Sequence, residues 1–217
     1  MKDKNHLDQL AEIRSLMERS TRFISLSGWS GIMAGIYALI GSYIARTHIQ
    51  NSEEYLSFID GYSSYYDSAN HINELAFFVV LGGAVVTLSI ITGVILTVNR
   101  AKKNNQTIWD KSAMRMLINM AIPLVAGGVF CAILMYHGYI GMVAPGTLLF
   151  YGLALLNGSK YTLDAIRHLG IAEIILGLIA SFDIGNGLFY WAVGFGVLHI
   201  LYGAFMWWKY EKSSSNA

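Results

Sequence analysis

Apolar residues are grouped along this chain into six long runs, and polar residues collect in the segments between them. A helix needs about 20 mostly apolar residues to cross a hydrocarbon core of roughly 30 Å, and each run is close to this length. The pattern therefore predicts an all-α fold, a polytopic membrane bundle of six transmembrane helices. The expected spans are Phe23–Ala45, Leu75–Val98, Met116–Tyr136, Tyr139–Leu156, Asp164–Phe182 and Leu188–Trp208.

The polar segments divide the chain into three parts. Residues 1–22 are hydrophilic, with apolar residues at helical spacing, which predicts an amphipathic cytoplasmic helix. Residues 23–208 form the six-helix membrane domain, and they include an acidic, tyrosine-rich outer loop over residues 46–73. Residues 209–217 form a short cytoplasmic tail.

The basic residues predict the orientation of the spans. The chain has 15 lysines and arginines, and with six spans only Arg46 falls on the side opposite to all the others. Because basic residues are enriched in cytoplasmic segments, the crowded side is expected to be cytoplasmic. Both termini are then cytoplasmic, and an odd number of spans would break this sorting.

Composition agrees with a membrane location. Charged residues make up 13% of the chain and hydrophobic residues 54%, whereas a soluble domain has about 25% charged residues. The formal net charge of +1 argues against a nucleic-acid partner, which would require a basic surface. We expect an integral protein of a bacterial cytoplasmic (inner) membrane, with the lipid bilayer as its main partner.

The first span carries two stripes of small residues, each at a spacing of four. Such stripes allow helix backbones to approach closely in lipid. The stripes predict a helix-packing face, used either inside the bundle or for a second copy or a membrane-protein partner, to which the N-terminal helix would contribute. The residues are Ser27, Gly31, Gly35, Ser30, Ala34 and Ala38.

Size and span number provide one resemblance. The chain resembles the substrate-binding components of modular vitamin transporters, in which small residues of an early span dock a partner, as Ala34 and Ala38 would do here. This resemblance covers architecture alone, and it implies a membrane component that binds a substrate.

Two short echoes suggest an internal repeat. Gly35–Ser42 in the first span matches Gly152–Ser159 in the fourth at four positions, and Gly128-Val129 in the third matches Gly196-Val197 in the sixth. Two three-span halves of opposite orientation would produce this order, which is common in transporters. A weak 3+3 inverted repeat is therefore one expectation for the fold.

Glu173 and His199 are the best candidates for chemistry. Glu173 interrupts the fifth span and His199 the sixth. At a rise of 1.5 Å per residue, both lie about 13–16 Å from the same surface, close to the midplane. Ionisable residues at this depth are costly and mark ion paths or proton relays. The alternative is a polar clasp that only fixes the register of two neighbouring helices.

The sequence contains no catalytic, cofactor or metal-binding motif. We therefore expect no cofactor and no metal, and we assign no catalytic residue. The favoured function is binding or transport of a small solute or ion, proton-coupled through Glu173 and His199. One alternative is a non-catalytic membrane partner that acts in regulation or assembly. A second alternative is an intramembrane enzyme that acts on lipid through the same pair.

Overall fold

A computed structural model describes residues 26–51, 68–103 and 111–212 of the chain. The described residues form six helical spans that are long and apolar enough to cross a membrane, as the hydrophobic pattern predicts. Two of the spans are built from several helical segments. The elements are α2 (Gly28–Asn51), α4 (Ser68–Lys103), α5 (Lys111–Tyr136), η1 (Ile140–Met142), α6 (Val143–Gly158), η2 (Ser159–Tyr161), α7 (Asp164–Phe182), η3 (Ile184–Asn186), α8 (Gly187–Trp191), η4 (Ala192–Leu198), α9 (His199–Met206) and η5 (Trp207–Lys212).

Several predicted boundaries differ from those of the structure. Helix α4 extends beyond both ends of its expected span, and α2 continues to Asn51, so both helices enter the predicted outer loop. The last span continues through η5 to Lys212, four residues into the predicted tail. The predicted helix over residues 1–22 lies outside the described residues, as does the middle of the outer loop.

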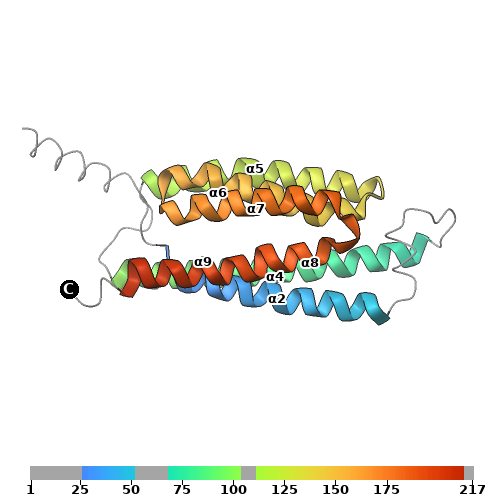
Figure 1. Cartoon of the computed structure of the whole chain (residues 1–217), viewed down its shortest axis with the longest axis horizontal. Coiled ribbons are helices and arrows are strands. Elements are labelled where there is room, and N and C mark those ends of the chain that lie inside the picture. Colours follow the sequence, from blue (N-terminus) through green and yellow to red (C-terminus); the bar gives the residue numbers. More distant parts are fainter. Residues whose placement is uncertain (1–25, 52–67, 104–110, 213–217) are drawn as a thin grey trace, which may run out of the picture.

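The six spans are arranged in two layers of three (Figure 1). In one layer α2 packs between α4 and the last span, which it contacts along α8, η4 and α9. In the other layer α6 packs between α5 and α7. Contacts between the layers are made by α8, η4 and α9 with α6 and α7. The layers therefore meet along α6, α7 and the last span.

Glycine residues hold α2 directly against the last span. A Cβ atom at Gly203 would lie 2.7 Å from the carbonyl oxygen of Gly28, and one at Gly35 would lie 2.6 Å from that of Gly196. Real side chains do not tolerate such distances to backbone atoms, so glycine is required at these crossings. The same device joins α6 to α7, where a Cβ atom at Gly152 would lie 2.7 Å from the carbonyl oxygen of Gly170.

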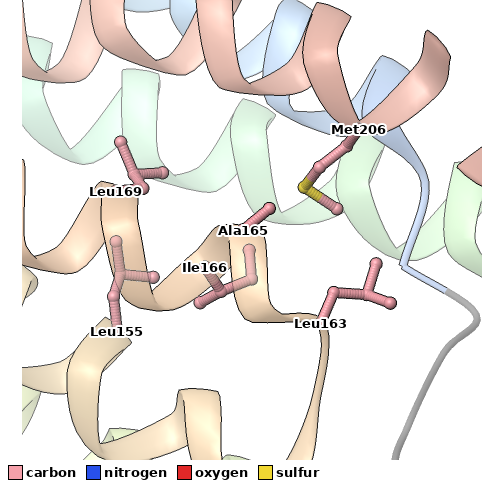
Figure 2. Packing of buried hydrophobic residues seen from close by; sticks show 6 residues of the cluster. All are labelled: Leu155, Leu163, Ala165, Ile166, Leu169 and Met206. Atoms are coloured by element: carbon pink, nitrogen blue, oxygen red, sulfur yellow. The ribbon is translucent and has the colours of Figure 1, made fainter. Parts of the chain in front are cut away.

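A cluster of buried apolar residues fills the space between the layers near one end of the bundle. We call this the basic end, because α4 ends there at Arg100, Lys102 and Lys103. Figure 2 shows Met206 extending from the last span toward α7. The members of the cluster are Leu155, Leu163, Ala165, Ile166, Leu169 and Met206. Their packing closes this part of the interface between the layers.

A tight turn connects α5 to η1 at the opposite end. The turn after α5 uses Gly138 at φ 80°, a left-handed conformation that favours glycine. The N–H groups of Gly138 and Tyr139 donate to the carbonyl oxygens of Met135 and Leu134 and so cap the end of α5. His137 and Gly138 thus form the abrupt reversal that their position between two apolar runs suggests.

The outer surfaces of α4 and α5 are covered by apolar side chains. Water would make such a surface unfavourable, whereas lipid tails accommodate it without cost. The exposed residues on these two helices include Val79, Val80, Val86, Leu88, Ile90, Ile91, Val94, Ile95, Leu117, Ile118, Ile122, Val125 and Val129. The surface fits the membrane location that the six apolar helices indicate.

An ion pair fastens the ends of three elements together at the basic end. Arg100 of α4 lies 3.1 Å from Glu211 of η5, and the two side chains are 14% and 18% exposed. The Glu211 carboxylate also accepts a hydrogen bond of 2.5 Å from the N–H of Gly28, the first residue of α2. Arg100 donates to the carbonyl oxygens of Leu26 and Tyr210. Glu211, near the end of the last span, therefore caps the N-terminus of α2.

Loss of this ion pair should destabilise the fold. Arg100→Gln leaves the part-buried Glu211 carboxylate without its cation, and hydrogen bonds to charged groups contribute about 1.5–3 kcal/mol each. We expect the free energy of unfolding in detergent micelles to fall by about this amount. Lys103→Gln, at the exposed end of the same helix, is the matched control. Equal losses in the two variants would contradict the role of the ion pair.

Candidate functional site

Glu173 is fully buried at the junction of the two layers. It is the tenth residue of α7, which has 19 residues, and so lies at the middle of the span. Its side chain is 0% exposed. A Cβ atom at Gly194 would lie 2.5 Å from Glu173 Oε2 and 2.4 Å from a methyl group of Leu148. The absence of a side chain at position 194 therefore provides the space that the carboxyl group occupies.

His199 approaches Glu173 from the other layer. It is the first residue of α9 and is 7% exposed. Its Nδ1 atom lies 3.5 Å from Glu173 Oε1 and 3.0 Å from the carbonyl oxygen of Gly194. Because a carbonyl oxygen only accepts, Nδ1 carries a hydrogen that points toward Gly194. The residues at similar depth in spans five and six thus lie side by side.

Tyr151 of α6 completes the arrangement. Its hydroxyl oxygen lies 2.7 Å from His199 Nε2. With Nδ1 protonated and the imidazole neutral, Nε2 accepts and the tyrosine hydroxyl donates. The ring of Phe195 packs against both, with centroids 5.0 Å from Tyr151 and 5.9 Å from His199. The site consists of Glu173, His199 and Tyr151, and we refer to these three residues as the midplane triad.

A π-helical segment places His199. Residues Ala192–Leu198 form η4, in which the backbone is wider than in an α-helix. The imidazole Nδ1 bonds to the carbonyl oxygen of Gly194, five residues earlier, and fixes the ring toward α7. Segments of this kind are rare and often occur at functional sites. Here the segment supplies both the space at Gly194 and the direction of the His199 side chain.

The Glu173 carboxyl group is not satisfied by its surroundings. Within the part of the chain that the structure describes, neither of its oxygens has a hydrogen-bond partner. His199 is near enough for a charge interaction, but its Nδ1 hydrogen is directed to Gly194. An ionised carboxylate in this place would be strongly destabilising unless the imidazole were also charged. The pair therefore has two electrically neutral forms, carboxylic acid with imidazole and carboxylate with imidazolium.

The two forms differ in the position of one proton, which lies on Glu173 in the first form and on His199 Nε2 in the second, because Nδ1 already carries a hydrogen. In the charged form, Nε2 would carry a hydrogen and Tyr151 would accept it through its hydroxyl oxygen. The tyrosine hydroxyl can bond to either form of the imidazole, because it can donate or accept a hydrogen bond. The midplane triad therefore offers two places for one proton, the carboxyl group of one layer and the imidazole of the other.

The predicted helix-packing face of the first span is occupied within the chain. Gly31 and Gly35 lie against the last span, where the nearest atoms belong to residues 196–203. Ser30 lies on the side of α4, since its Cβ atom is 3.9 Å from a Cβ placed on Gly93. Ser27 and Ala38 are buried, whereas Ala34 is half-buried. The face thus packs between the neighbours of α2 in its own layer.

Sequence reasoning missed Tyr151 and Gly194. A signal for Tyr151 existed, because tyrosine prefers the membrane interface and this one lies in the middle of a span. Gly194 gave no signal among so many glycines. Among the described residues, no group of three His, Cys, Asp or Glu side chains is arranged to hold a metal ion. Comparisons of the chain with known protein families, with curated proteins and with solved structures found no match.

Proposed function

We propose that this protein moves a small solute or ion across the membrane and couples the movement to protons through the midplane triad. The observation that carries the proposal is the fully buried Glu173 carboxyl group, which has no hydrogen-bond partner among the described residues. A group that served only to clasp two helices would be stabilised by its neighbours. A group that must take up and release a proton is better left unsatisfied.

The two-layer arrangement supplies the means of coupling. Glu173 and Tyr151 belong to one layer, whereas His199 and Gly194 belong to the other. The carboxylate–imidazolium form of the pair attracts the layers to each other, because it places opposite charges on them. The form with carboxylic acid and imidazole attracts them much less. A proton taken up from one side of the membrane would convert the carboxylate–imidazolium pair to carboxylic acid and imidazolium and remove this attraction. Its uptake would therefore favour a different spacing of the layers, as alternating access requires.

The proposal includes a 3+3 inverted repeat. If α2 corresponds to α6, α4 to α7 and α5 to the last span, each layer consists of two helices from one half and the third helix of the other half. The central helices are then α2 and α6, which contain the matching segments Gly35–Ser42 and Gly152–Ser159. An inverted repeat with exchanged third helices would produce this helix order, which supports the proposal.

The experiment measures proton movement by the purified protein in phosphatidylethanolamine and phosphatidylglycerol vesicles. A potassium gradient with valinomycin imposes a potential that is negative inside, and pyranine in the lumen reports pH. We expect the lumen to acidify faster than in vesicles without protein. An identical rate in the two preparations, with the protein correctly inserted, would overturn the proposal.

The orientation is proposed from the basic residues, with both termini in the cytoplasm of a bacterial cell and the protein in its inner membrane. A cysteine introduced at Ser63 should react with an impermeant maleimide on intact spheroplasts. One introduced at Asn104 should react only after lysis. Cys131→Ala provides a background without thiols, although the native thiol is already buried. The reverse labelling would contradict the orientation.

A further inference from the structure

A groove runs along the membrane-facing side of the junction between the layers, at the basic end. It is an open groove between α7 and the last span with a volume of about 430 Å³, which is within the range of small-ligand sites. Leu201, Phe205 and Lys209 line one wall at intervals of four residues. At 1.5 Å per residue this stripe is about 12 Å long and passes from apolar to basic toward the end of the helix.

The opposite wall is formed by the first turns of α7. Asp164 and His168 line it, both exposed and four residues apart. His168 Nδ1 lies 3.0 Å from the carbonyl oxygen of Asp164, and the ring is held along the wall. Lys209 Nζ lies 5.4 Å from the centre of the Phe205 ring, above the apolar part of the groove. A cation on one wall and a carboxylate on the other therefore line an otherwise mostly apolar groove.

The geometry points to a binding site for one phospholipid with a primary ammonium headgroup, of the phosphatidylethanolamine type. The phosphate would bind Lys209, and the ammonium group would bind Asp164. One acyl chain would lie along Phe205 and Leu201, which are 42% and 58% exposed. The lining thus offers a cation for the phosphate, a carboxylate for the ammonium group and apolar side chains for an acyl chain.

The groove lies beside the apolar cluster between the layers, so a bound lipid would affect the packing of the layers. Ala165 and Tyr202 line the groove and also belong to, or pack against, the apolar cluster between the layers. A lipid held there would contact both layers beside that cluster. The inference depends on the membrane location alone and holds whether or not the midplane triad carries protons.

Native mass spectrometry of the full chain in detergent tests the site, with three lipids of identical acyl chains. We expect phosphatidylethanolamine to bind more tightly than phosphatidylglycerol, and diacylglycerol, which has no phosphate, to bind least. Lys209→Ala should weaken the binding of both phospholipids about fivefold. This factor corresponds to the contribution of about 1 kcal/mol that one basic residue makes at the membrane surface. Lys103→Ala, at the same end of the bundle, should leave both unchanged.

Two further variants separate the groove from general surface charge. Asp164→Asn should remove the preference for phosphatidylethanolamine over phosphatidylglycerol while Lys209 still binds phosphate. Leu201→Trp retains every charge but fills the apolar part of the groove, and should weaken both phospholipids. The inference would be overturned if Leu201→Trp bound the phospholipids as tightly as the wild type does. Equal effects of Lys209→Ala and Lys103→Ala on this binding would also overturn it. Diacylglycerol binding as tight as that of the phospholipids would overturn it as well.

Discussion

Glutamine in place of Glu173 is expected to reduce the proton flux of reconstituted vesicles to the level of vesicles without protein. The amide has the size and shape of the carboxyl group but cannot release a proton near neutral pH. His199 would keep its bonds to Gly194 and Tyr151, so the site should remain assembled. The pyranine assay in a valinomycin-driven potential measures the flux.

A second measurement on the same variant separates a relay from a clasp. Glu173 is buried without a hydrogen-bond partner among the described residues, so Glu173→Gln should leave the melting temperature in detergent unchanged or raise it. A clasp would instead lose stability when its carboxylate is removed. Arg167→Gln, which also replaces a charged group with an amide at an exposed position of α7, is the control and should alter neither flux nor stability.

Two outcomes would contradict the relay. One is a wild-type flux in Glu173→Gln, because the proton would then bypass the buried carboxyl group. The other is a large loss of melting temperature with unchanged flux, because Glu173 would then act as a structural residue. His199→Ala should also abolish the flux, since Glu173 would have no neighbour able to accept its proton.

Alanine at Gly203 is expected to destabilise the bundle strongly. The added Cβ atom would lie 2.7 Å from the oxygen of Gly28 and 2.7 Å from the nitrogen of Ile32. Both are backbone atoms, so α2 and the last span would have to separate. Overpacking in a filled interior costs about 1–3 kcal/mol, and the separation would also expose neighbouring crossings. The free energy of unfolding in mixed micelles is the quantity to measure.

Glycines that face open space provide the matched comparison. A Cβ atom at Gly82 or Gly128 would meet no atom within 4 Å. Alanine at these positions should be neutral or slightly stabilising, because alanine is the better helix former. If Gly203→Ala and Gly128→Ala had the same effect, the close crossing of α2 and the last span would not contribute to stability.

Hydropathy was sufficient to predict the six spans, because the membrane imposes a length and a polarity on each helix. The pairing of Glu173 with His199 was predictable in part, since depth follows from the position of a residue within its span. The two side chains could be placed at one level by counting residues. Their distance could not be obtained in this way, because it depends on how the helices are rotated.

Other parts of the site were beyond prediction for a physical reason. Tyr151 reaches His199 across 48 positions of the sequence, and Glu211 reaches Gly28 across 183. Neither contact leaves a local pattern. The π-helical segment Ala192–Leu198 also has no signature in hydropathy, although it decides where the His199 ring points. The division into two layers depends on which glycines meet, and the chain contains 22 of them.

The cap that Glu211 provides for α2 has a consequence for the order of biosynthesis. Gly28 leaves the ribosome 183 residues before Glu211. At about 5–20 residues per second, the first span waits roughly 10–40 s in the membrane for its cap. Gly196 and Gly203, which pack against the glycines of α2, are also translated late. The helix inserted first is therefore among the last to be fixed, and until then its polar N-terminus and small-residue surface depend on the insertion machinery or on lipid.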